Sequence, residues 1–247
     1  MRYAILVSYD GTDFCGWQVQ PNKRTVQSVL EQALSKRLSQ EIRLTASGRT
    51  DAGVHAYGQV CHFDAQTSIP AKKIADSVNP SLPSDVKILK SAQADDSFDA
   101  NRTAKKKTYR YTFYRSERDD PMYERYGVRL PFVDLEKMKE GAALLVGEHD
   151  FKAFCASGSS VKTTVRTIYD ASFTQEGNLL VFRITGNGFL YNMVRTLVGE
   201  LVDIGRGRLT CADLESSFRT GSRQGIGKTM PARGLALECV NYDTLNW

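Results

Sequence analysis

Residues 48–56 (GRTDAGVHA) are the segment whose residue types are best suited to chemistry. A carboxylate, Asp51, stands between Gly48 and Gly53, and glycines allow sharp turns and close approach of the backbone. Such a loop can present an aspartate at the mouth of a cleft, where the carboxylate can act as a nucleophile. Asp and Gly are also common turn residues, so a Thr-Asp-Ala-Gly taken alone is more often structural.

A second segment, residues 102–115, combines basic and aromatic side chains without a single acid. Basic side chains displace counterions from a nucleic-acid backbone, and aromatic rings stack on unpaired bases, so this pattern favours an RNA surface. An exposed strand with a solvated basic face is the alternative, since alternation alone would bury some of the rings. The basic residues are Arg102, Lys105, Lys106, Lys107, Arg110 and Arg115, and the aromatic residues are Tyr109, Tyr111, Phe113 and Tyr114.

Arg195 lies in an apolar helical stretch after Gly188, with no acid close to it in the sequence. A guanidinium there needs either a partner or a path to the surface, because a buried unpaired charge is costly. Reaching the surface along its aliphatic stem is the structural alternative.

Composition excludes several classes of protein. The 247 residues carry a formal net charge of +5, with ordinary hydrophobic and charged fractions of 41% and 25%, so neither disorder nor a membrane protein is expected. No stretch is long enough to span a membrane and no signal peptide is apparent, so we expect a cytoplasmic protein. The five cysteines lack a Cys-x-x-Cys pair, so we expect neither disulfides nor a metal site.

The elements that must position these residues follow from hydrophobic periodicity. In the first half we expect a strand at 3–9, a helix after Thr25, a short strand at 42–44, a strand at 59–63, a short helix after Pro70 and a strand at 86–89. Strand, helix, strand, strand, helix, strand is the order of the ferredoxin-like split unit. The loop at 47–54, which carries Asp51, joins two of these strands.

The second half repeats the plan. We expect a strand at 107–115, a helix from Asp134, strands at 168–173 and 179–185, a long helix after Gly188, a helix at 212–219 and a final strand at 235–240. The polar residues 95–97 are the expected joint. The sequence therefore predicts an α+β fold with two ferredoxin-like (RRM-like) domains, 1–97 and 98–247, whose antiparallel sheets flank a central catalytic cleft.

The segment around Asp51 resembles the signature of the A family of tRNA pseudouridine synthases. Similar segments cover nearly the whole chain: residues 9–18 (YDGTDFCGWQ), 79–83 (NPSLP), 107–111 (KTYRY), 186–195 (GNGFLYNMVR) and 231–235 (PARGL). One departure is Asn101, where the family usually has arginine after the alanine, so one backbone contact to RNA is in doubt.

The resemblance implies an isomerase that converts uridine to pseudouridine at positions 38 to 40 of the tRNA anticodon stem-loop. It implies Asp51 as nucleophile, Arg195 as its ion-pair partner and Tyr109 beside the target base, with Leu235 lining the pocket. Substrate contacts are expected from Arg49, Arg102, Lys105, Lys106 and Lys107. It also implies no cofactor and no metal, a homodimer, and one tRNA lying across both subunits.

Some alternatives remain open at this stage. Leu235 could equally be ordinary strand core. Asp51 could form its adduct with the sugar or with the base ring, and Tyr109 could act as a base or only pack. Two rival functions are a non-catalytic RNA-binding protein and a metal-dependent nuclease that uses Asp10, Asp13 and Asp51.

Overall fold

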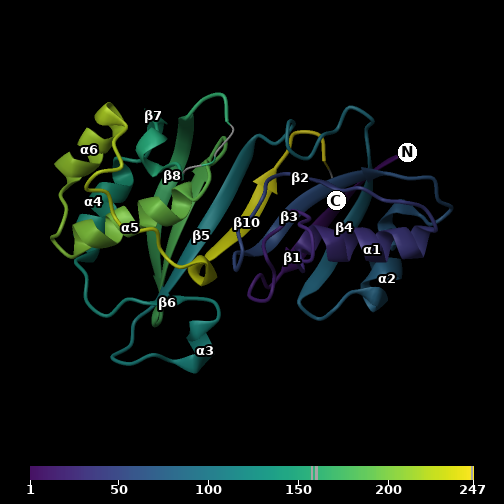
Figure 1. Cartoon of the computed structure of the whole chain (residues 1–247), viewed down its shortest axis with the longest axis horizontal. Helices are drawn as coiled ribbons and strands as arrows, with labels where there is room; N and C mark the ends of the chain where they lie inside the picture. The colour runs from purple at the N-terminus through teal and green to yellow at the C-terminus, as the bar shows by residue number, and fades with distance from the viewer. Residues whose placement is uncertain (157, 159–160, 246) are drawn as a thin grey trace. The chain divides into compact units, whose positions relative to one another are not determined.

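The computed structural model describes residues 1–156, 158, 161–245 and 247, and Figure 1 names its elements. The chain is a mixed α+β protein, as expected from the sequence. Its contacts divide it into two compact units: unit 1 is Met1–Lys106 with Ala236–Trp247, and unit 2 is Lys107–Leu235. The sequence predicted a boundary after residue 97, whereas this division also places residues 98–106 and the last strand in unit 1. Within the described residues, no helix has the length and apolar character needed to cross a membrane.

Unit 1 is built on a sheet with the strand order β4-β1-β3-β10. The strands are β1 (Arg2–Tyr9), β3 (His55–Asp64), β4 (Val86–Ala94) and β10 (Leu235–Asn241), and the two-residue β2 (Thr45–Ala46) also pairs with β3. β1 is antiparallel to both β3 and β4, whereas β10 is parallel to β3 through Ala236 and His55. The helices of this unit are α1 (Val26–Leu38) and α2 (Ile74–Val78), with 3₁₀ turns at Ala71–Lys73 and Asn79–Ser81.

Helix α1 begins where the sequence predicts. The Thr25 side chain accepts from the Ser28 backbone N–H at 3.3 Å, and Ser28 returns a side-chain contact to Thr25 in a capping box. The strand expected at 42–44 is not formed there. The amide of Ile42 donates to Ser35 Oγ and that of Leu44 donates to Glu31 Oε1, so α1 side chains occupy these groups, and β2 follows at Thr45.

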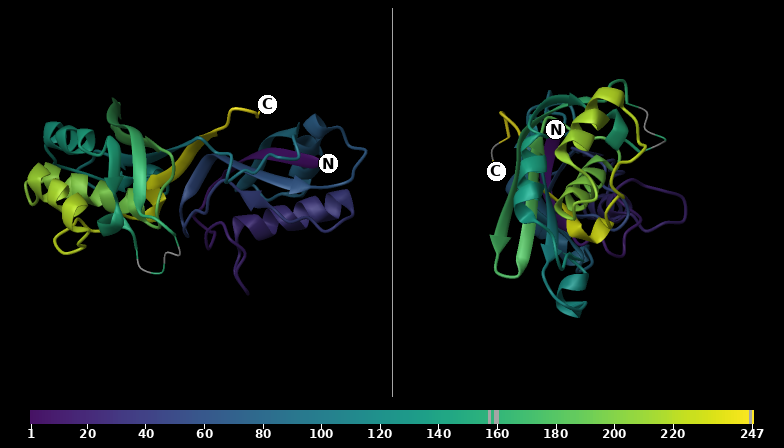
Figure 2. Two further views of the ribbon diagram at one scale, coloured as in Figure 1. Left: turned by 90° about the horizontal axis from the view of Figure 1, so that it is seen from above. Right: turned by 90° about the vertical axis from the view of Figure 1, so that its left-hand side faces the viewer.

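Unit 2 is built on a sheet with the strand order β5-β9-β8-β7. The strands are β5 (Lys106–Tyr114), β7 (Gly147–Asp150), β8 (Val165–Glu176) and β9 (Leu179–Gly186), all antiparallel to their neighbours, and β6 (Val128–Arg129) pairs with β5 in parallel. The helices are α3 (Pro121–Glu124), α4 (Leu135–Ala143), α5 (Met193–Gly205) and α6 (Cys211–Thr220), with 3₁₀ turns at Lys152–Phe154 and Ala232–Gly234. Figure 2 shows α4, α5 and α6 gathered on one side of β8 and β9.

The core of unit 2 joins alternate residues of the sheet to α5. Tyr111 opposes Phe182 and Phe113 opposes Leu180 across the β5–β9 ladder, and all four side chains are fully buried. Leu197 and Leu201 of α5 are equally buried. The period-2 strand and the period-3.6 helix expected from the sequence are therefore confirmed, and α3, β6 and β7 are short additions that were not predicted.

Candidate functional site

Asp51 lies in the loop between β2 and β3, at residues 47–54, which we call the aspartate loop. Its entry is fixed by neighbouring β3. Ser47 donates its backbone N–H to the Val60 carbonyl at 2.8 Å, and its buried hydroxyl donates to Gln59 Oε1 at 2.5 Å. The Gln59 amide then donates to the Gly48 carbonyl at 2.8 Å. The sheet thus holds the first residues of the loop before the chain reaches Asp51.

A second loop, residues 10–17, holds the aspartate loop from the other side, and we call it the anchoring loop. The Trp17 amide donates to the Thr50 carbonyl at 3.0 Å, and the Gly53 amide donates to the Phe14 carbonyl at 3.3 Å. Both backbone bonds flank Asp51, so the position of its Cα is fixed on either side. Thr50 is also tied to the sheet, since its buried hydroxyl lies 2.8 Å from the Tyr9 hydroxyl.

Two glycines let the anchoring loop come this close. A Cβ on Gly11 would lie 2.0 Å from the Val54 carbonyl oxygen, and one on Gly16 would lie 2.8 Å from the Thr50 carbonyl oxygen. Gly16 also has a φ of +85°, in the left-handed region where side chains are strained. Any other residue at these two positions would push the backbone of the aspartate loop away.

His55 closes the exit of the aspartate loop. Its Nδ1 accepts the Gly11 backbone N–H at 3.0 Å and lies 3.2 Å from Asp10 Oδ1. The same Asp10 oxygen accepts the backbone N–H and the hydroxyl of Thr12.

In the described part of the chain, no group of three His, Cys, Asp or Glu side chains is placed to hold a metal ion. Asp10, Asp13 and Asp51 therefore do not form the cluster that a metal-dependent nuclease would need.

Asp51 itself is half-buried, and the neighbouring Arg49 is exposed. A half-buried carboxylate on a backbone fixed at both sides keeps access to a ligand while its Cα keeps one position. This is the arrangement that a nucleophilic or general-base carboxylate requires. Arg49, exposed two residues earlier, is available to a polyanionic ligand.

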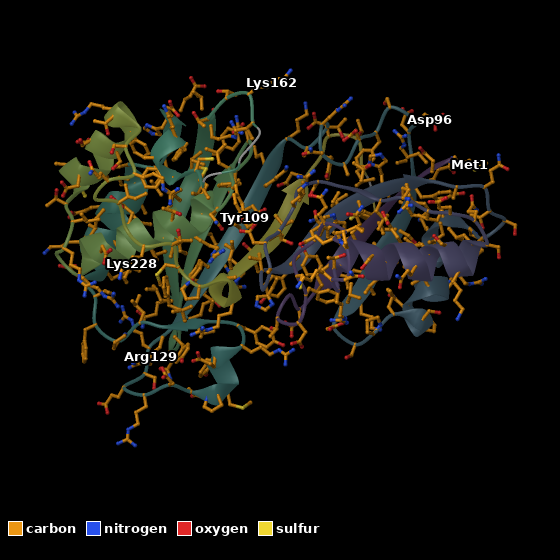
Figure 3. The ribbon with its side chains drawn as sticks, in the orientation of Figure 1. Met1, Asp96, Tyr109, Arg129, Lys162 and Lys228 are labelled. Atoms are coloured by element: carbon orange, nitrogen blue, oxygen red, sulfur yellow. The ribbon has the colours of Figure 1, made fainter. Side chains whose placement is uncertain are left out.

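Tyr109 is the aromatic residue of β5 that the resemblance places at the target base. It lies opposite Ile184 of β9 and is 8% exposed, and its ring meets that of Phe189 edge-on at 5.1 Å and 82°. Figure 3 labels Tyr109 on its strand. The edge-on contact fixes the ring plane, so Tyr109 can serve as a rigid wall for a flat ligand.

Arg195 lies in the first turn of α5 and is half-buried. Its Nε donates to the Met230 carbonyl at 2.7 Å, and one terminal nitrogen donates to Asn192 Oδ1 at 2.9 Å. Asn192, the residue before the helix, has a left-handed φ of 60°, which brings its amide back over the first turn. These two contacts orient the guanidinium from within unit 2.

The segment that follows Met230 packs on the same part of unit 2. The Tyr111 hydroxyl donates to the Pro231 carbonyl at 2.7 Å, and a Cβ on Gly234 would lie 2.5 Å from the Tyr111 ring. Burial raises the pKa of the Tyr111 hydroxyl, while the nearby charges of Arg195 and Arg233 lower it. Leu235, the last residue of unit 2, is buried, with 6% of its surface exposed, and its place in the wall of the pocket stays a prediction.

The basic residues expected to contact RNA differ in their exposure and in their charged neighbours. Arg102 is 88% exposed beside Asp99, and Lys105 forms an exposed ion pair with Asp243 at 3.0 Å. Lys106 is exposed, whereas Lys107 is half-buried. Burial and the charge of Arg166 lower the pKa of Lys107 to about 8. At neutral pH Lys107 is still mostly a cation, but it holds its proton less strongly than a surface lysine does.

Unit 1 therefore holds Asp51 and Arg49 together with Arg102, Lys105 and Lys106, and unit 2 holds the remaining expected site residues. The ion pair between Asp51 and Arg195 stays a prediction. Sequence reasoning missed the residues that fix the aspartate loop, namely Tyr9, Gly16, Trp17 and Gln59. The only sequence signal for the first three was their place in the family-like segment 9–18, which carries no indication of their contacts.

Comparison with known proteins supports one family over nearly the whole chain. A family model described as tRNA pseudouridine synthase matches residues 5–102 and 142–243. The tRNA pseudouridine synthase A of Bacillus licheniformis is 44% identical over 246 residues, which cover 98% of this chain and 100% of that protein. The proteins of the same name from Halalkalibacterium halodurans and Bacillus subtilis are 45% and 43% identical and cover 95% and 98% of this chain and 90% and 100% of their own lengths. The chain belongs to the tRNA pseudouridine synthase family.

Proposed function

We propose that this protein converts uridine to pseudouridine in tRNA, with Asp51 as the nucleophile. Family membership carries the reaction class. The observation that supports Asp51 is the loop that bears it, whose backbone is hydrogen-bonded on both sides of the aspartate to the anchoring loop. A loop held in this way would deliver a carboxylate to the same place in every turnover.

The reaction is an isomerisation, so every atom of the substrate is retained. The bond between the sugar and N1 of uracil breaks, and a bond between the sugar and C5 forms. The C5 proton is lost, and N1 ends with a proton. The target base has to leave its stack to expose the glycosidic bond, and a pocket walled by aromatic rings suits such a flipped base. Tyr109, held edge-on by Phe189, supports that role.

Asp51 attacks either the sugar carbon or the base ring, and both routes release, turn and reattach the uracil without a redox change. Arg195 keeps Asp51 ionised, because a nearby cation lowers the pKa of a carboxyl that burial would raise. Tyr109 either takes the C5 proton or packs against the ring. The basic residues 102–107 bind the phosphate backbone.

Finer features of the proposal follow the family resemblance. The substrates are uridines 38 to 40 in the anticodon arm, the enzyme is a cytoplasmic homodimer, and one tRNA lies across both subunits. Each half of the chain follows the ferredoxin-like plan. The strand order β4-β1-β3, with α1 and α2 in the connections, supports this plan for unit 1, and β5, β9 and β8 with α4 and α5 support it for unit 2.

Incubation with undermodified tRNA, followed by nucleoside mapping, tests the reaction and the site together. Asp51→Asn should form no pseudouridine while it keeps the fold and the tRNA affinity of the parent, because only the nucleophile changes. Asp76→Asn is the matched control, since Asp76 is a 69% exposed aspartate that pairs with Lys73 in the same unit. Pseudouridine formation by Asp51→Asn would remove Asp51 from the mechanism. Tight binding without modification by the parent would favour the RNA-binding rival.

A further inference from the structure

Residues 227–230, which we call the clasp segment, lie along helix α5 and are bonded to it by backbone and side chain. Met230 donates its backbone N–H to the Arg195 carbonyl at 3.1 Å, and the Met230 carbonyl accepts from Arg195 Nε. The hydroxyls of Thr196 and Thr229 lie 3.0 Å apart. Figure 3 labels Lys228 in this segment. One end of the clasp segment therefore sets where the Arg195 guanidinium lies.

The clasp segment touches the backbone of the helix directly. A Cβ on Gly199 would lie 1.8 Å from the Lys228 carbonyl oxygen, and one on Gly227 would lie 2.4 Å from the Glu200 nitrogen. Both glycines are therefore required for space. Because the two backbones lie so close, polar groups at the Gly227 end of the segment can also reach α5.

At the opposite end of the segment from Met230, the polar contact with α5 is made by Glu200. Its side chain is 1% exposed, and its Oε2 accepts the Gly227 backbone N–H at 2.5 Å. Its other oxygen, Oε1, is buried with no hydrogen-bond partner among the described residues. Burial raises the pKa of this carboxyl, and the bond from Gly227 opposes the rise. A carboxyl buried with one oxygen unsatisfied destabilises the fold, so packing alone does not explain Glu200.

We propose that Glu200 is a positioning residue for Arg195 in the formation of pseudouridine. Glu200 holds Gly227, the clasp segment carries that constraint to Met230, and the Met230 carbonyl sets the direction of Arg195 Nε. With Asn192 holding a terminal nitrogen, the guanidinium plane is fixed at two points. The inference rests on the proposed function, because it needs Arg195 to act on the reacting centre.

Two substitutions at Glu200 separate the effect of its hydrogen bond with Gly227 from the effect of its charge. Glu200→Leu removes the acceptor for Gly227 at similar volume, and Glu200→Gln keeps an acceptor oxygen. We expect Glu200→Leu to lower kcat about ten- to hundredfold with little change in KM, since small displacements of a catalytic group have effects of that size. Glu200→Gln should restore kcat to within about threefold of the parent, because the bond to Gly227 is kept.

Ile204→Val is the matched control for a general loss of stability in α5. Ile204 faces Gly141 of α4, so its substitution loosens the helix without touching the clasp segment. We expect Ile204→Val to lower the melting temperature and to leave kcat unchanged. If Glu200→Leu does not fold, Thr229→Val removes the Thr196 contact at nearly constant shape and should lower kcat in the same direction, about threefold or more.

A double-mutant cycle with Arg195→Lys identifies the route. If Glu200 acts through Arg195, Glu200→Leu should have little further effect on kcat once Arg195 is replaced. Independent, multiplying effects of the two substitutions would overturn the positioning role, and so would an unchanged kcat in Glu200→Leu. An Arg195→Lys variant with full activity would overturn the role of Arg195 and this inference with it. A parent protein that makes no pseudouridine would overturn the proposed function first.

Discussion

Replacing Gly16 by alanine should lower both the stability of the protein and its rate of pseudouridine formation. Gly16 has a φ of +85°, and an L-residue in the left-handed region costs about 1–2 kcal/mol. The added methyl group would lie 2.8 Å from the Thr50 carbonyl oxygen, directly before Asp51. An ordinary contact begins at 3.4 Å, so one of the two backbones must move by roughly 0.6 Å.

The cost of that movement adds to the cost of the strained φ. Overpacking a closely packed site costs about 1–3 kcal/mol. Alanine also reduces the freedom of the unfolded chain, which offsets about 0.4–1 kcal/mol, so the net loss of stability should be about 1–4.5 kcal/mol. Because the displaced carbonyl belongs to the residue before Asp51, kcat should fall by about ten- to hundredfold.

Gly207→Ala provides the matched control. Gly207 has a φ of +69°, and a Cβ there would meet nothing within 4 Å. It therefore pays the conformational cost alone, about 1 kcal/mol after the unfolded-state gain, and kcat should not change. Urea unfolding gives the two losses of stability, and steady-state kinetics on undermodified tRNA give the two rates. Equal losses of stability with an unchanged kcat in Gly16→Ala would refute the argument that this contact positions Asp51.

Three further outcomes are expected. Replacing Lys105, Lys106 and Lys107 by alanine should reduce the slope of log affinity for tRNA against log salt by about 2, and an identical slope would show that these side chains face away from RNA. Activity should survive EDTA, and loss that only added metal restores would contradict the reaction proposed for Asp51. The folded-state pKa of Glu200 lies above its ordinary value of 4.5, so the folded protein keeps a proton there that the unfolded chain releases. The contribution of Glu200 to stability therefore falls as pH rises above about 4.5. Melting temperatures measured from about pH 4 upward should show this fall in the parent but not in Glu200→Gln. An equal decline in both proteins would assign the fall to other groups.

Local pattern was enough to predict most elements. Thr25 marked the start of α1, and the alternation of Tyr109, Tyr111 and Phe113 predicted β5, because capping and burial are decided within a few residues. Residues 42–44 show the limit of such patterns. Their apolar alternation predicted a strand, but side chains of the preceding helix α1 accept hydrogen bonds from the backbone amides of Ile42 and Leu44, a contact that alternation does not signal.

The site was only partly predictable for the same reason. Asp51, Arg195 and Tyr109 were predicted through segments that resemble a family, and their residue types are suited to the chemistry. The groups that hold them were not found, because a contact such as Tyr9 to Thr50 spans forty-one positions and leaves no periodic signal. Glu200 lies in a helix whose inward face is apolar, and only the tertiary structure brings Gly227 to its carboxylate.

The return of β10 to unit 1 determines when the sheet of that unit is completed during synthesis. A ribosome completes residues 107–235 before it delivers β10, so unit 2 can fold while unit 1 still lacks a strand. Until then the His55 end of β3 has no parallel neighbour, because Ala236 and Leu237 supply that pairing. His55 is also the residue that closes the aspartate loop against Gly11. The contacts that fix the aspartate loop all lie within residues 9–60, so a nascent chain can form this loop before β10 emerges. A chain cut before Ala236 should therefore keep the loop contacts but leave the His55 end of β3 as an open sheet edge, where another strand could pair.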